Sequence, residues 1–294
     1  MLAPADTVRA GWISWGLVAA AVLVQIVYPL TGEDLRTPVT VTSVLVFAAA
    51  SVADVTRRHG LRGALALLVV AGGGGLVAEA VGVATGFPFG VYAYTGTLGP
   101  EVLGVPVVVP LAWVMMSWPA LVVGRTLGRG PLGTVAVGAA ALAAWDLFLD
   151  PQMVDAGHWW WAEPVPALPL VPGIPLTNYA GWLLVATLLI GALHRLLGPD
   201  SGPSGPASAL YLWTYGSSVV AHLVFFGLPG SAVVGGLVMG LVAVPFAAAL
   251  LRRPDAPARP GPRPESLPAP RSGPDAPDRP ERAADRRGRS GRSR

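Results

Sequence analysis

The feature that most constrains this chain is a series of eight apolar stretches joined by mostly short polar connections. A helix needs about 20 mostly apolar residues to cross a lipid bilayer. In chain order, the stretches are Trp12–Leu30, Pro38–Ala53, Gly63–Thr85, Val105–Gly124, Leu132–Asp150, Tyr179–Leu197, Ala207–Gly227 and Ala232–Leu251. Because 53% of the 294 residues are hydrophobic and only 13% are charged, the composition fits a membrane protein rather than a soluble one. The sequence therefore predicts an all-α polytopic membrane helix bundle with about eight transmembrane helices.

The arginine residues predict a topology for these helices. Cytoplasmic connections of membrane proteins carry an excess of basic residues. Here the basic connections lie at positions 57–62, 125–129, 195 and from 252 onward. The alternate connections carry almost none, with Arg36 as the exception. We therefore predict a multi-pass protein of the cell membrane with both termini cytoplasmic and the two long connections, 86–104 and 154–177, on the opposite side.

Residues 254–294 form a tail rich in Pro, Arg, Asp and Ser. Such a segment cannot bury enough apolar surface to fold, so we predict a transmembrane domain over 1–253 and a disordered cytoplasmic tail over 254–294. The tail could lie on anionic lipid or have no specific role. Because this tail holds half of the 20 basic residues, the net charge of +3 is weak evidence for a nucleic-acid partner, and we expect none.

Two acidic residues lie in the fifth apolar stretch, where the chain reads WDLFLDPQMVDAGHWWW over Trp145–Trp161. Asp146 and Asp150 are four residues apart, so they share one face of a helix. Pro151 is expected to end that helix. A charge at the centre of a spanning helix costs about 2.5–3.5 kcal/mol on insertion scales, and two neighbouring carboxyl groups do not both ionise easily. The pair therefore predicts a proton donor beside an anion, unless both acids merely end the helix in the headgroup layer.

Four segments resemble a membrane carotenoid-biosynthesis family that includes bisanhydrobacterioruberin-type C50 carotenoid hydratases and γ-carotene 1′-hydratases. They are GFPFGVYAYTGTLGP (Gly86–Pro100), VPLAWVMMSWP (Val109–Pro119), WDLFLDPQMVDAGHWWW (Trp145–Trp161) and IPLTNYAGW (Ile174–Trp182). The resemblance implies a lipophilic carotenoid substrate, C40 or C50, in contact with membrane lipid. It implies addition of water across a terminal isoprenoid double bond, and it admits other carotenoid-pathway enzymes as partners.

The implied reaction needs an acid, a wall that tolerates a cation, and one water molecule. Protonation of the CH carbon of the double bond gives a tertiary cation, which water then captures, so we expect no cofactor and no metal. Asp146 or Asp150 is the expected acid, with the ionised partner stabilising the cation and orienting the water. Glu79, in the third apolar stretch, is a second candidate acid.

Aromatic and amide side chains supply the expected substrate contacts, since ring faces stabilise positive charge and an amide can hold water. The candidates are Tyr92, Tyr94, Trp113, Trp145, Trp159, Trp160 and Asn178. Each has an alternative interpretation: the aromatic residues could form an interfacial belt, Asn178 could cap a helix, and Glu79 could bond a neighbouring helix. His158 has no second histidine at ligand spacing, so no metal site is predicted, and His222 is interpreted as a packing or polar-network residue.

Two other functions remain open at this point. A lycopene cyclase-type protein or an isomerase would share the protonation step, but a cyclase would capture the cation with a neighbouring alkene and leave the mass unchanged. A carotenoid-binding or transport protein would hold an unaltered pigment and would tolerate loss of the carboxyl groups.

Overall fold

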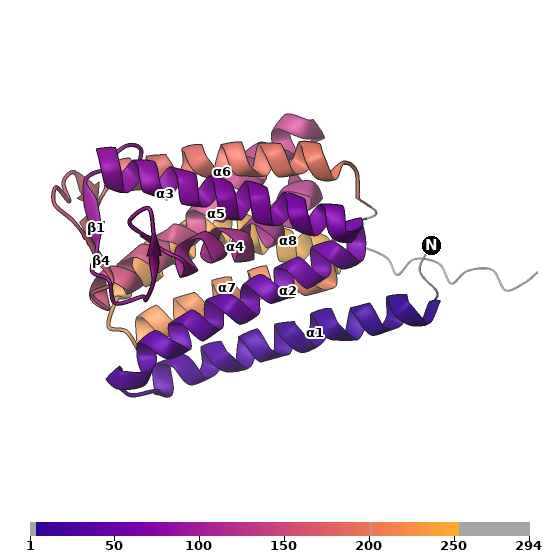
Figure 1. Ribbon diagram of the computed structural model, residues 1–294, viewed down its shortest axis with the longest axis horizontal. Coiled ribbons are helices and arrows are strands. Elements are labelled where there is room, and N and C mark those ends of the chain that lie inside the picture. Colours follow the sequence, from indigo (N-terminus) through magenta and orange to yellow (C-terminus); the bar gives the residue numbers. More distant parts are fainter. Residues whose placement is uncertain (1–3, 201, 253–294) are drawn as a thin grey trace, which may run out of the picture. The chain divides into compact units, whose positions relative to one another are not determined.

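The computed structural model describes residues 4–200 and 202–252, and the predicted tail lies outside them. Eight α-helical elements and two short helical turns follow one another: α1 (Pro4–Val27), η1 (Tyr28–Leu30), α2 (Glu33–Leu67), η2 (Leu68–Gly73, a π-helical turn), α3 (Gly74–Thr85), α4 (Val108–Leu127), α5 (Gly130–Asp155), α6 (Leu176–Leu197), α7 (Gly205–Val224) and α8 (Pro229–Leu251). The helices pack as one bundle (Figure 1). The predicted all-α membrane helix bundle is confirmed, while the domain boundary at residue 253 stays a prediction.

Within the described residues, six helical stretches are long and apolar enough to cross a membrane: Gly11–Leu30, Glu33–Thr85, Val108–Leu127, Gly130–Asp155, Leu176–Leu197 and Pro229–Leu251. Gly60 divides the second of these, because its backbone (φ 67°, ψ −170°) has a conformation that essentially only glycine adopts. The chain then returns along α3 (Figure 1). With this division the six stretches become seven. The remaining helix, α7, has 20 residues but is less apolar, and it brings the number of long helical segments to eight.

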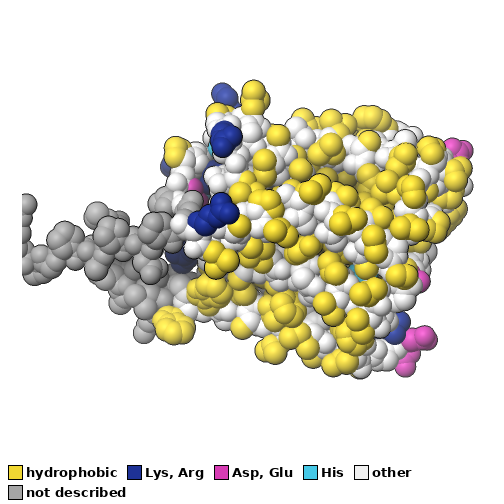
Figure 2. Space-filling model, turned by 180° about the vertical axis from the view of Figure 1, so that it is seen from behind, with side chains coloured by type: hydrophobic (Ala, Val, Ile, Leu, Met, Phe, Trp, Pro, Cys, Tyr) yellow, Lys and Arg dark blue, Asp and Glu magenta, His cyan; other side chains and the backbone are white. Residues whose placement is uncertain are grey.

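The outer faces of the helices are apolar, as a lipid environment requires. Among the exposed side chains on them are Val77, Leu188, Leu237 and Leu241. Figure 2 shows hydrophobic side chains over most of one face, with basic side chains gathered at one end and acidic ones mainly at the other. The apolar outer surface fits a membrane protein. Which end is cytoplasmic stays a prediction.

The most buried helix is α4, which packs against α2 and α5 and also contacts α6, α7 and α8. Of its most apolar 18-residue stretch, 72% is buried, against 22% for α1. Trp113 and Trp118, both fully buried on α4, are among the largest side chains of the core. Side chains on α4 are therefore well placed to form the wall of an internal site.

Six short strands cover one end of the bundle: β1 (Tyr92–Tyr94), β2 (Glu101–Val102), β3 (Val105–Pro106), β4 (Trp159–Trp161), β5 (Ala167–Leu168) and β6 (Val171–Pro175). They form three two-stranded antiparallel sheets. In one of them, β1 pairs with β4, so that Tyr92 lies opposite Trp161 and Tyr94 opposite Trp159. The two long connections of the sequence thus meet at the same end of the bundle.

Two local predictions are wrong. Pro151 does not end its helix, because α5 continues to Asp155. Proline removes only one backbone hydrogen bond, and its fixed φ is compatible with a helix, so a spanning helix tolerates it when neighbouring groups satisfy the freed carbonyl. The basic residues at 57–62 do not form a loop either, because they lie in helix on both sides of Gly60.

Candidate active site

Glu79 on α3 is a buried carboxyl group held by three donors. The hydroxyls of Tyr92 and Tyr94 donate to Glu79 Oε2 at 2.5 and 2.8 Å, and the indole Nε1 of Trp113 donates to Oε1 at 3.1 Å. The residue is only 5% exposed. A carboxylate accepts hydrogen bonds only, so this arrangement matches an ionised Glu79. We refer to these four residues as the Glu79 site.

The glycines that precede Glu79 bring Trp113 close to it. A methyl group added at Gly75 would lie 2.6 Å from Trp113 Cδ1, which is closer than two carbon atoms can approach. Glycine at this position therefore lets the indole ring rest on the backbone of α3, one turn before Glu79. The close approach at Gly75 is therefore between the backbone of α3 and a side chain of α4.

Tyr92 has two acceptors within reach. Its hydroxyl lies 2.5 Å from Glu79 Oε2 and 3.2 Å from the backbone oxygen of the same residue. Burial and then the charge of Glu79 raise the pKa of Tyr92, and the same two causes raise the pKa of Tyr94. Both phenols therefore keep their protons and act as donors across the physiological pH range.

Asp146 and Asp150 on α5 form a second buried carboxyl site, which we call the aspartate pair. The side-chain amide of Asn178 donates to Asp146 Oδ2 at 2.8 Å and also to Asp150 Oδ2. Trp159 Nε1 donates to Asp150 Oδ1 at 3.2 Å. Asp146 Oδ1 is buried and has no donor among the described residues. The shared amide of Asn178 therefore leaves one carboxyl oxygen of the pair without a hydrogen bond.

The β1–β4 sheet joins the two carboxyl sites. Tyr94, which donates to Glu79, lies opposite Trp159, which donates to Asp150. The two rings meet edge to face with their centroids 5.7 Å apart. Residues two apart on a strand point to the same side, so Tyr92 and Tyr94 both reach Glu79. A pairing of loops far apart in sequence therefore positions the partners of both acids.

Next to the Glu79 site is a cavity of about 550 Å³, which is lined mainly by apolar atoms. Of the predicted site residues, those that line it are Glu79, Tyr94, Trp113, Trp145 and Trp159. Asp146, Asp150, Tyr92, Trp160 and Asn178 are not part of the lining. Trp160 points away because neighbouring residues on a strand alternate in direction, and it is 53% exposed between the buried Trp159 and Trp161.

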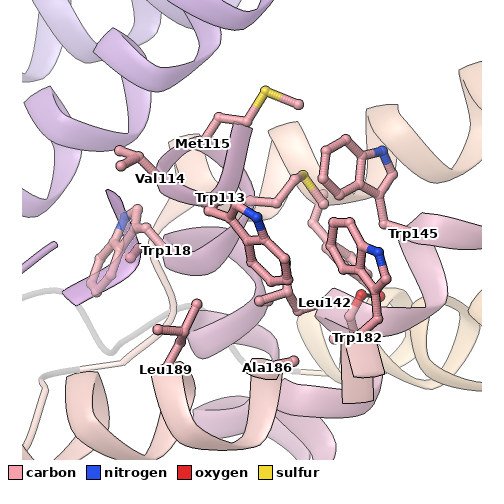
Figure 3. Packing of buried hydrophobic residues seen from close by; sticks show 14 of the residues in the cluster. Trp113, Val114, Met115, Trp118, Leu142, Trp145, Trp182, Ala186 and Leu189 are labelled. Atoms are coloured by element: carbon pink, nitrogen blue, oxygen red, sulfur yellow. Dashed lines mark hydrogen bonds between the residues drawn. The ribbon is translucent and has the colours of Figure 1, made fainter. Parts of the chain in front are cut away.

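Trp182 on α6 also lines the cavity, although it is not among the site residues predicted from the sequence. Its ring stacks on that of Trp113 with the centroids 4.1 Å apart, and the Trp145 ring meets it edge to face at 6.0 Å. Figure 3 shows the three indoles together beside Leu142 and Ala186. Trp182 is the last residue of Ile174–Trp182, one of the four segments that resemble the family, so the sequence did contain a signal for it. The cavity thus presents several ring faces near Glu79.

Asn178 and His158 take part in defined hydrogen bonds. The N-cap of α6 is Pro175, so Asn178 does not cap that helix and is buried against the aspartate pair. His158 Nδ1 lies 2.7 Å from the hydroxyl of Thr97, and burial lowers the pKa of His158. In the described part of the chain, no group of three or more His, Cys, Asp or Glu residues could hold a metal ion.

Comparison with known proteins identifies the family of this chain. Residues 39–206 match the family described as carotenoid biosynthesis protein. A stretch of 117 residues is 37% identical to the bisanhydrobacterioruberin hydratase of Haloarcula japonica and covers 38% of each of the two chains. No solved structure matches this chain. Since the family match spans more than half of the residues, the chain belongs to the carotenoid biosynthesis protein family.

Proposed function

We propose that this protein hydrates a terminal isoprenoid double bond of a carotenoid, without a redox cofactor or a metal. The family makes it a carotenoid-modifying membrane enzyme, and the named relative is a hydratase that shares 37% identity over part of its length. The observation that carries the proposal is Glu79, a buried carboxyl group in the wall of an apolar, aromatic cavity. Such a cavity suits a hydrocarbon end group, and the carboxyl group can supply its proton.

In this proposal Glu79 is the proton donor, because it lines the cavity and the aspartate pair does not. When Glu79 is ionised, all three of its neighbours donate to it. When Glu79 carries a proton, Tyr92 can turn its hydroxyl hydrogen to the backbone oxygen of Glu79, 3.2 Å away, and accept across the 2.5 Å contact. The same site therefore accommodates Glu79 before and after it gives its proton to the CH carbon of the double bond.

The tertiary cation that follows would be stabilised by the rings of Trp113, Trp145, Trp159 and Trp182, which line the cavity. Two of these indoles donate their N–H groups to carboxyl groups: Trp113 to Glu79 and Trp159 to Asp150. Donation to a carboxylate makes an indole ring richer in electrons, which strengthens its attraction for a cation. The aspartate pair thus acts through Trp159 and by its negative charge, rather than as the acid.

The test is the mass of pigments from lycopene-producing cells with and without this chain. A gain of one or two water masses supports hydration at one or both ends. An unchanged mass with an altered retention time contradicts hydration and favours cyclisation or isomerisation. If lycopene is unchanged, the same comparison in a C50-producing strain decides between a C50 substrate and a binding role, since unaltered pigment there contradicts the proposal.

A further inference from the structure

The part of the cavity lining that α7 supplies includes polar side chains, and none of the predicted catalytic residues lies on α7. Thr214, Ser218 and His222 on α7 all line the cavity. They are spaced four residues apart, so they form one stripe on the helix, which we call the α7 stripe. Residues 39–206 match the family and α7 begins at Gly205, so this wall lies almost wholly outside the matched region.

His222 is the most buried polar group of the α7 stripe, with 1% of its surface exposed. Its Nδ1 lies 2.5 Å from the hydroxyl of Ser231 on α8, and that hydroxyl donates to the backbone oxygen of Leu228 at 3.4 Å. The rings of Phe148 and Phe226 flank the imidazole with centroids 5.2 and 5.4 Å away. The side chain is therefore fixed on three sides.

The contacts of Ser231 bear on which nitrogen of His222 carries the hydrogen. The Ser231 hydroxyl has an acceptor in the backbone oxygen of Leu228 and lies 2.5 Å from His222 Nδ1, so it can accept from a protonated Nδ1. In that tautomer Nε2 has a free lone pair, and Nε2 has no partner among the described residues. A lone pair in the wall of an apolar cavity is a site for an O–H donor.

We propose that His222 Nε2 binds the water molecule that captures the carotenoid cation and takes its proton. This inference rests on the proposed function. Water would donate one hydrogen to Nε2 and direct an oxygen lone pair at the tertiary carbon. As the C–O bond forms, the O–H bond to His222 breaks, Nε2 gains the proton, and the product is a neutral tertiary alcohol. Return of that proton to the Glu79 carboxylate restores both groups.

Deuterium separates protonation from water capture. Membranes that contain the chain are incubated with lycopene in D₂O, and hydrated product and deuterium in recovered lycopene are measured by mass spectrometry. For His222→Phe, which keeps a ring between Phe148 and Phe226, we expect hydration to fall at least tenfold while recovered lycopene still gains deuterium. The cation then returns a hydrogen ion to the carboxylate instead of binding water. His194→Phe, at the far end of α6, is the matched control and should hydrate normally.

Ser231→Ala is a second variant that leaves the imidazole in place. We expect a smaller loss of hydration, again with deuterium exchange retained, and recovery in Ser231→Thr. If His222→Phe does not accumulate in the membrane, the Ser231 variants carry the test. Full hydration by His222→Phe, or equal loss of hydration and exchange in a variant that still binds lycopene, overturns the inference. If the wild-type chain neither hydrates nor exchanges, it is the proposed function that fails.

Discussion

The two buried carboxyl sites of this protein differ in what surrounds them. Glu79 receives three donors, one or two on each oxygen, and lines the cavity. The aspartate pair shares the amide of Asn178, has one oxygen without a donor among the described residues, and does not line the cavity. Both sites lie at the same end of the bundle and are joined by the β1–β4 sheet.

Burial of an acid and its access to substrate are therefore separate properties. A pair of acids at helical spacing stands out in a sequence because its cost in a membrane is high. The single acid is less conspicuous, yet it has the position that a proton donor needs. Substitutions at the two sites test this difference.

The largest effect is expected from Glu79→Gln. An amide fills the same space but cannot give up a proton, and general acid catalysis contributes about 10²–10⁴-fold to a rate. We expect hydration, measured as product per amount of protein, to fall at least 100-fold. Glu101→Gln, on the exposed strand β2, is the matched control and should keep full activity. Substantial hydration by Glu79→Gln would remove Glu79 from the role of acid.

A smaller effect is expected from Asp146→Asn and Asp150→Asn. Each removes a negative charge near the cation but leaves the Glu79 site intact, so we expect a roughly 10-fold loss of hydration, about 1.4 kcal/mol. Asp155→Asn, on the exposed last turn of α5, serves as the control. A loss as large as that of Glu79→Gln would return the role of acid to the aspartate pair.

Tyr92→Phe tests whether Glu79 needs a partner that can both donate and accept. The change leaves Tyr94 and Trp113 as donors. It removes the hydroxyl that accepts a hydrogen bond from Glu79 when Glu79 is protonated. We expect a loss of several-fold, about 1 kcal/mol, as for an ordinary hydrogen bond. Tyr94→Phe is the informative comparison, because it removes a donor only and should cost less. Equal losses would mean that the second acceptor of Tyr92 has no role.

Gly75→Ala should act on stability rather than on chemistry. The added methyl group would meet Trp113 at 2.6 Å, and overpacking of this kind costs about 1–3 kcal/mol. We expect the thermal midpoint in detergent to fall by a few degrees. Gly73→Ala is the matched control, because a methyl group there meets nothing within 4 Å and alanine favours the helix. Equal midpoints for the two variants would contradict the close contact.

Much of the fold follows from the sequence, because the length and apolarity of each stretch are local properties. The spacing of Asp146 and Asp150 also places them correctly on one face of α5. The spacing does not predict which neighbours that face meets, and it meets Asn178 rather than the cavity. The partners of Glu79 depend on the pairing of β1 with β4, and such long-range pairing has no local signal. The roles of the individual site residues therefore stay predictions.

The turn at Gly60 has a consequence for how the protein enters the membrane. The helices on either side of Gly60 are joined by that residue alone, without a loop. Because no loop separates them, neither helix can insert into the bilayer without the other, and Glu33–His59 and Leu61–Thr85 insert together as a hairpin. With the predicted topology, Arg57, Arg58 and Arg62 beside the turn hold its tip on the cytoplasmic side. Glu79 is thus carried to its final depth by the same step that builds the hairpin.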